Sequence, residues 1–160
     1  MTVEEALRAA LDDEYKARAT YRAVLDTFGA IRPFVNIVES EERHIEALTR
    51  LFERHGFELP PDEWKDRVAP PESVAVACAK GVEAEVENAA LYEELLEAAR
   101  GHPDVEETFR NLLSASQENH LPAFERCLQR EQHGSGRPGA AAGGHPGHRR
   151  RHRGGRGGDR

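Results

Sequence analysis

Glu41 and His44 form a Glu-x-x-His pair within the segment Ser40-Glu41-Glu42-Arg43-His44. Residues three positions apart lie on one face of a helix, so both side chains can point toward the same place. A carboxylate and an imidazole presented by one helix are ligands that suit iron-class metals in a helix bundle. Such a pair also arises by chance in a Glu-rich chain, so its meaning depends on partners elsewhere.

The two halves of the chain repeat one pattern. Glu14 stands seven residues before Tyr21, and Glu85 stands seven residues before Tyr92. Each tyrosine is followed by a histidine, after 23 residues in the first half and 28 in the second, and then by an apolar ladder. Each half therefore predicts a helix with an inward Glu and then a helix with an inward His. A pseudo-twofold axis between two such hairpins would bring together Glu14, Glu41, His44, Glu85 and His120.

Each of these residues also has a purely structural interpretation. Glu14 and Glu85 lie in acidic stretches, where helical carboxylates are usually solvated, and Glu87 competes with Glu85 for the inward position. The two histidines could be hydrogen-bonded core residues, and the two tyrosines could be core aromatics whose hydroxyls reach a partner. The coincidence of all these positions under one repeat favours a metal site.

Apolar residues recur at helical spacing in four segments. Thr2 and Glu5 predict a capping box for the first helix, which Gly29 ends. Pro33 begins the second helix and Gly56 closes it. The core positions expected in these two helices are Leu7, Leu11, Ala17, Tyr21, Val24, Leu25, Phe34, Ile37, Val38, Ile45, Leu48, Leu51 and Phe52.

The second half repeats this arrangement. Ser73 can cap a third helix that ends near Gly101, and Asp104 with Glu107 predicts the cap of a fourth. The expected core positions are Val74, Cys78, Val82, Leu91, Leu95, Leu96, Phe109, Leu112, Leu113, Leu121, Phe124 and Leu128.

Residues 57–72 break the helical pattern with Pro60-Pro61 and Pro70-Pro71. This connection is too long for a tight hairpin, so we expect it to cross along the outside of a bundle, anchored by Phe57 and Trp64. Short loops on either side make consecutive helices antiparallel. The sequence therefore predicts an all-α, four-helix, ferritin-like up-down bundle with a long crossover between helices 2 and 3.

Composition and charge divide the chain into two parts. Its 160 residues suit one folded domain, and no apolar run is long enough to cross a bilayer. Residues 1–130 carry 15 Lys and Arg against 27 Asp and Glu, whereas residues 131–160 carry seven Arg against one Glu and one Asp. We therefore predict a domain at 1–131 and a disordered Gly/Arg/His-rich basic tail at 132–160. No signal peptide is visible at the start, so the expected location is cytoplasmic.

The tail and the cysteines leave alternatives open. Arginines in the tail could attract nucleic acid, and its histidines could bind metals, but it has no aromatic residues for base stacking, which favours a solvated segment. Cys78 lies seven residues before Glu85 and Cys127 seven after His120, so antiparallel helices would make them neighbours about 10 Å from the site. They are either buried small apolar residues or a redox-active pair, and because they lie inside helical patterns they do not indicate a disulfide framework.

Several short segments carry a family resemblance, namely Glu14-Tyr-Lys-Ala-Arg-Ala-Thr-Tyr21, Ser40-Glu-Glu-Arg-His44 and Asn119-His120-Leu121, together with Asn36, Gly81, Glu85 and Phe124. Through them, residues 4–130 resemble a ferritin-like domain family of unknown function, distantly similar to rubrerythrin and the ferritins. In rubrerythrin-like proteins two irons are held by one Glu from each of two helices and a Glu-x-x-His from each of the other two. The resemblance implies that Glu14 and Glu85 are terminal ligands, that Glu41 bridges, and that His44 and His120 each bind one ion.

The sequence departs from that pattern at Gln117, where the second Glu-x-x-His should have its Glu. Glu118 is one residue late, which on an α-helix turns it about 100° away. With one bridging carboxylate missing, five ligands could hold two ions, one ion or none. Without metal, we expect the pKa values of the buried carboxylates to rise, and Arg18 could neutralise part of their charge.

The favoured function is binding of iron or manganese, one or two ions, with di-iron oxidase or peroxidase-type chemistry linked to oxidative stress or iron handling. The chain has no Cys-x-x-Cys centre, so a separate redox partner would supply electrons. The alternative is a metal-free helical scaffold or interaction protein that acts through its surface or its basic tail. Nucleic acid is a partner only through the tail, no membrane partner is expected, and a homodimer is left open.

Overall fold

The computed structural model describes residues 1–134, which form a four-helix bundle without strands. The first three helices are α1 (Val3–Phe28), α2 (Phe34–His55) and α3 (Val74–Ala98). The fourth is composite, with α4 (Pro103–Ala115), a π-helical segment η1 (Ser116–His120) and α5 (Leu121–Gly134) following one another without a break. This confirms the predicted fold class. The predicted disordered tail lies outside the described residues, apart from its first three positions, which belong to α5.

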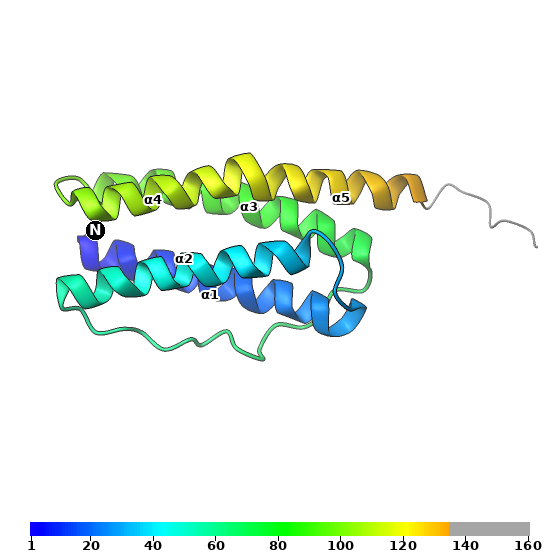
Figure 1. Cartoon of the computed structure of the whole chain (residues 1–160), viewed down its shortest axis with the longest axis horizontal. Helices are drawn as coiled ribbons and strands as arrows, with labels where there is room; N and C mark the ends of the chain where they lie inside the picture. The colour runs from blue at the N-terminus through cyan, green and yellow to red at the C-terminus, as the bar shows by residue number, and fades with distance from the viewer. Residues whose placement is uncertain (135–160) are drawn as a thin grey trace, which may run out of the picture.

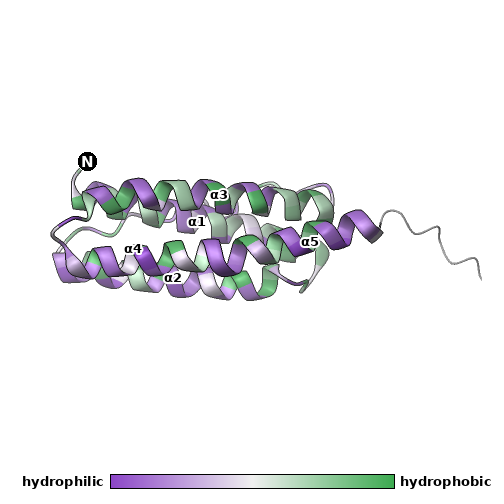
Figure 2. Ribbon diagram, turned by 90° about the horizontal axis from the view of Figure 1, so that it is seen from above, coloured by the Kyte–Doolittle hydropathy of each residue, from purple (hydrophilic) through white to green (hydrophobic). Residues whose placement is uncertain are grey.

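The helices pair as the loop lengths predict. α1 packs against α2 and α3, α3 packs against α4 and α5, and α2 contacts α4. Residues 57–72 run the length of the α1–α2 hairpin on its outer side, which lets α3 begin at the end of the bundle opposite the end of α2 (Figure 1). Figure 2 shows hydrophilic and hydrophobic residues alternating along each helix, with the last turns of α5 projecting beyond the other helices.

Helix ends follow local chemistry. The Thr2–Glu5 capping box is present, and the Ser73 hydroxyl accepts from the Val76 N–H at 3.1 Å. Asp104, however, is not the cap of the fourth helix, because that helix already begins at Pro103. Proline needs no N–H partner at the first helical position, so the helix begins two residues earlier than it would with Asp104 as its cap, and His102 takes the cap position.

Two apolar clusters fill the bundle and flank a polar layer at its middle. The first core cluster includes Leu7, Leu48 and Phe109, and the second includes Phe34 and Phe124. On α2, for example, Glu41 and His44 lie between Ile37 of the second cluster and Leu48 of the first, as the chain order requires. The polar layer is therefore closed off at both ends by packed hydrocarbon.

The crossover is anchored as predicted. Phe57 and Trp64 are partly buried against the first core cluster, and the Trp64 indole N–H donates to the Asp12 carboxylate at 2.9 Å. A tryptophan with a satisfied N–H can bury its ring without leaving an unpaired donor. The segment thus lies along the bundle although it has no regular secondary structure.

The cysteines are neighbours, as the antiparallel arrangement predicts, and they are joined. Cys78 of α3 and Cys127 of α5 form a disulfide with a Cα–Cα separation of 5.7 Å. The sequence left their pairing open, and the structure decides it with one isolated bridge between facing helices, which needs no multi-cysteine framework. One turn further on, α3 approaches α5 so closely that a Cβ at Gly81 would lie 2.6 Å from the Phe124 ring.

Within the described residues, no helix combines the length and apolar character needed to cross a membrane.

Candidate metal centre

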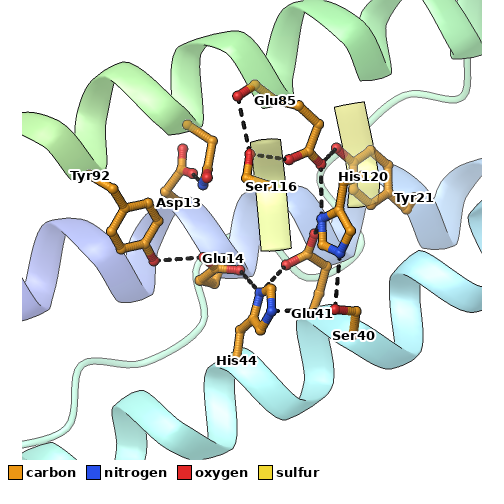
Figure 3. A network of polar contacts seen from close by, with 11 residues as sticks. Asp13, Glu14, Tyr21, Ser40, Glu41, His44, Glu85, Tyr92, Ser116 and His120 are labelled. Carbon is orange, nitrogen blue, oxygen red and sulfur yellow. Dashed lines mark hydrogen bonds and ion pairs between the residues drawn. The ribbon is translucent and has the colours of Figure 1, made fainter. Parts of the chain in front are cut away.

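The five residues singled out by the repeat meet at the middle of the bundle (Figure 3). α1 contributes Glu14, α2 contributes Glu41 and His44, α3 contributes Glu85, and η1 contributes His120. Four of them are at most 4% exposed, and the His44 side chain is 12% exposed. They fall into two overlapping groups in which all ligand atoms lie within 4.8 Å of one another, Glu14–Glu41–His44 and Glu41–Glu85–His120.

Glu41 belongs to both groups because its two oxygens face different histidines. Its Oε2 lies 3.1 Å from Nδ1 of His44, and its Oε1 lies 3.4 Å from Nδ1 of His120. The other two carboxylates, Glu14 and Glu85, each complete one of the two groups. Glu14 Oε2 lies 3.2 Å from Nδ1 of His44, and Glu85 Oε1 lies 3.4 Å from Nδ1 of His120.

The two tyrosines of the repeat hold the outer carboxylates in a crossed pattern. The Tyr92 hydroxyl on α3 donates to Glu14 Oε1 on α1 at 2.6 Å. The Tyr21 hydroxyl on α1 donates to Glu85 Oε1 on α3 at 2.9 Å. Both rings are buried, so these are core aromatics whose hydroxyls end in the polar layer. The pseudo-twofold relation expected from the sequence is thus present in the contacts.

Because of the π-helical segment, Ser116 and not Gln117 faces the cluster together with His120. Gln117 is exposed, whereas Ser116, four residues before His120, is buried and donates from its hydroxyl to Glu85 Oε2 at 2.6 Å. The resemblance places Gln117 where a bridging Glu is missing, but Gln117 does not face the cluster, because η1 widens the turn and brings Ser116 to the inner face. π-Helical turns of this kind occur often at functional sites.

The structure decides two alternatives that the sequence left open. Glu85 is buried and Glu87 is exposed, so Glu85 is the inward carboxylate of α3. Arg18 does not neutralise the cluster, because its guanidinium forms ion pairs with Glu42 at 2.9 Å and Asp62 at 2.7 Å. Arg18 therefore ties α1 to α2 and to the crossover.

Some polar neighbours were not predicted as part of the site. Ser40 lies against both histidines, with its Oγ 3.3 Å from Nε2 of His44 and 3.0 Å from Nε2 of His120. The Asn88 amide donates to the Asp13 carboxylate at 2.6 Å beside the cluster. Asn88 follows Glu85 by three residues, so helical spacing could have predicted that both side chains face the cluster. No sequence signal predicts the π-turn that brings Ser116 to the inner face.

Burial and mutual contacts set the charges of the cluster. Burial, with the nearby charge of Glu41, raises the pKa of Glu14 to about 8. Burial alone would also raise the pKa of Glu41, but hydrogen bonding to Glu14, His120 and His44 outweighs it and lowers that pKa to about 2. The expectation that every carboxylate pKa rises is therefore wrong for Glu41.

The two imidazoles favour their charged forms. Burial opposes this, but hydrogen bonds and charges of Glu14 and Glu41 raise the pKa of His44 to about 9. Glu41 and Glu85 act in the same way on His120 and raise its pKa to about 10. At neutral pH the metal-free cluster thus pairs two imidazolium groups with carboxylates.

A cavity of about 40 Å³ adjoins the cluster. Its wall contains the five clustered residues, and it extends between α1 and α3 to residues that include exposed Lys16 and Glu87. This volume accommodates about three water-sized molecules. The polar layer is therefore reachable from the α1–α3 face by small ligands.

The donor set is chemically suited to a metal ion. Carboxylate oxygens and imidazole nitrogens ligate first-row divalent metals, and five such groups converge from all four helices of the bundle. The carboxylate and histidine groups could therefore hold a metal.

Comparison with known proteins agrees with the fold. The hypothetical protein MJ0754 from Methanococcus jannaschii DSM 2661, known from a crystal structure, matches with a TM-score of 0.72 and 24% sequence identity over 81% of each chain. At this identity the likeness concerns the fold alone. No curated protein matches. The family model described as an uncharacterized protein domain, DUF2202, matches residues 5–136, and the chain therefore belongs to the DUF2202 family.

Proposed function

We propose that this protein binds two iron or manganese ions at the mid-bundle cluster, with Glu41 shared between them. Glu14 and His44 would complete one ligand set, and Glu85 and His120 the other. The observation that carries the proposal is the position of Glu41, whose two oxygens face histidines on different helices at 3.1 and 3.4 Å. A carboxylate held in this way is suited to bridging two cations.

The donor types support iron or manganese. Three carboxylates and two imidazoles are borderline-to-hard ligands, and the two cysteines are not available as thiolates because they form a disulfide. Three negative charges against two divalent ions leave a small positive excess that water or a small anion can balance. Protons on His44, His120 and Glu14 would leave as metal binds.

We further propose an oxidase or peroxidase-type role or a role in iron handling. Bound iron would supply one-electron chemistry toward dioxygen or peroxide, and the cavity of about 40 Å³ has room for ligands of that size. The chain's own part would be to hold the carboxylates through Tyr21 and Tyr92 and to exclude larger molecules. A separate redox partner would return electrons. This agrees with the resemblance to rubrerythrin-like proteins.

A metal-free structural cluster is the second candidate, and one observation favours it. In the described part of the chain, every buried side-chain nitrogen or oxygen has a hydrogen-bond partner without any ion. Such a self-satisfied network can stabilise a bundle by itself. Under this alternative the protein would act as a helical scaffold.

An anaerobic titration of the metal-free full-length chain with ferrous or manganous ion distinguishes the metal-binding function from the metal-free scaffold. The proposal predicts tight binding that is lost in His44→Ala and in His120→Ala while circular dichroism stays helical. A control with His145, His148 and His152 changed to Ala removes the histidines beyond residue 134 and should bind as the wild type does. Equal, weak binding by all four proteins would instead establish the scaffold. For the oxidase role, consumption of dioxygen or hydrogen peroxide by the loaded protein is measured directly.

A further inference from the structure

Ser40 occupies an unusual position between the two histidines. Its Oγ lies 3.3 Å from Nε2 of His44, one turn further along α2, and 3.0 Å from Nε2 of His120 on η1. The two imidazole rings stack with centroids 5.6 Å apart and planes inclined by 24° (Figure 3). A single hydroxyl thus contacts the outer nitrogens of both rings.

The inner nitrogens of both rings point the other way. Nδ1 of His44 faces Glu14 and Glu41, and Nδ1 of His120 faces Glu41 and Glu85. Each ring therefore has one nitrogen toward the carboxylates and one toward Ser40. A histidine ligand is oriented by whatever its second nitrogen contacts, and that contact also fixes its tautomer.

One hydroxyl oxygen can serve both rings at once. It carries two lone pairs, so it can accept an Nε2–H from His44 and another from His120. These hydrogen bonds are compatible with charged imidazoles, in which both nitrogens carry hydrogen. They are equally compatible with neutral rings that offer a bare Nδ1 to a metal, because the Nε2–H remains in place. Metal uptake would then require no rotation of either ring.

We propose that Ser40 is a shared positioning residue, whose single hydroxyl orients both histidines and thereby couples the two halves of the metal site. The inference rests on the proposed metal-binding function, because the histidines would be oriented for metal binding. The contacts between Ser40 and the two rings, however, are present in the metal-free protein. Although Ser40 is close in sequence to His44 alone, it acts equally on His120, which is 80 residues away. Its replacement should therefore affect both half-sites rather than one.

Three variants of the full-length chain test this. Ser40→Ala removes the oxygen, Ser40→Thr keeps it, and Thr49→Ala removes another α2 hydroxyl, which donates to the backbone of Ile45 outside the cluster. With ¹⁵N-labelled histidine, NMR of the metal-free protein at neutral pH should show protected Nε2–H protons on His44 and His120. In Ser40→Ala both should exchange with solvent at least ~10-fold faster, since the shared acceptor is gone, while Ser40→Thr and Thr49→Ala keep their protection.

Cobalt(II) binding provides the second readout. Loss of a group that orients a ligand typically costs 10–100-fold in metal affinity, so Ser40→Ala should weaken both cobalt sites by about that factor, and Ser40→Thr should restore them. A change confined to His44, or none at either ring, would overturn the inference. If the wild type binds no cobalt, the proposed function fails, while the exchange measurement still decides the role of Ser40.

Discussion

Glu41 and the two histidines set the charge state of the polar layer. In the metal-free protein, Glu41 has a pKa of about 2, whereas His44 and His120 have pKa values of about 9 and 10. The Nδ1 protons of the two imidazolium groups therefore lie where metal ions would bind, between the ring nitrogens and the carboxylate oxygens. The protons on these imidazoles balance the charge of the carboxylates when no metal is bound. A metal ion must displace these protons in order to bind.

The stability of the metal-free protein should depend on pH in the alkaline range. The pKa values of His44 and His120 lie above their ordinary value of 6.5, so their contribution to folding is fully present below pH 6.5. It is lost as the pH rises through 9 and 10, and Glu14, with a pKa of about 8 instead of 4.5, acts in the same direction. We predict that Tm falls steadily from pH 7 to pH 10 in thermal scans of metal-free protein. A flat or rising Tm over this range would contradict these charge states.

The sequence predicted the candidate metal ligands better than it predicted the residues around them. Glu14, His44, Glu85 and His120 were predicted from the repeat of a Glu, a Tyr seven residues later and a following His in each half, and Glu41 from its place three residues before His44. Ser116 could not be predicted, since its inward position depends on a π-turn whose formation is decided by packing between helices. The exposed position of Gln117 has the same cause.

The register of η1 can be tested by measuring the free energy of unfolding of two variants. Ser116 is 2% exposed and donates to Glu85, so Ser116→Ala should lower the free energy of unfolding by about 1.5–3 kcal/mol. Gln117 is exposed, and Gln117→Ala should stay within about 0.5 kcal/mol of the wild type. Urea unfolding of both variants checks this. The reverse order of effects would mean that the fourth helix is a regular α-helix through residues 116–120.

The contact between α3 and α5 offers a matched pair of glycine substitutions. A Cβ at Gly81 would lie 2.6–2.8 Å from Phe124 ring atoms, whereas one at Gly134 would meet nothing within 4 Å. Gly81→Ala should therefore destabilise the bundle by about 1–3 kcal/mol, because the helices must separate or the ring must move. Gly134→Ala should be neutral or slightly stabilising in the same unfolding experiment. Equal behaviour of the two variants would show that α3 and α5 are not in such close contact.

The disulfide joins the same two helices. It closes a loop of 49 residues, for which the chain-entropy model gives about 4 kcal/mol of stabilisation. We predict that reduction with dithiothreitol lowers the free energy of unfolding by up to that amount, and that a Cys78→Ala/Cys127→Ala protein no longer responds to the reductant. Two freely titrating thiols in air-oxidised, unreduced protein would exclude the bridge.

The whole molecule is the scale at which the sequence was most informative. Helix number, the outer course of residues 57–72 and the anchoring Trp64 followed from apolar period, proline placement and loop length. These features depend on local chemistry and on the need to bury one face of each helix. The disulfide did not follow, because pairing of two isolated cysteines depends on the distance between helices, which the sequence gives only approximately.

The arrangement of the bundle also determines where ions can reach the cluster. Core clusters close both ends of the polar layer, and the cavity extends outward between α1 and α3. A site at this depth would be filled by small ions and small ligands.

Anomalous diffraction can show directly whether two ions bind on either side of Glu41, as we propose. Crystals of the full-length protein would be grown after anaerobic loading with iron or manganese, and data collected at that metal's absorption edge. We expect two anomalous peaks within the mid-bundle cluster, one beside Glu14 and His44 and the other beside Glu85 and His120, with Glu41 between them. Loaded crystals with no peak in the cluster, or with peaks only elsewhere on the chain, would contradict it and leave the self-satisfied polar network as a structural feature of the bundle.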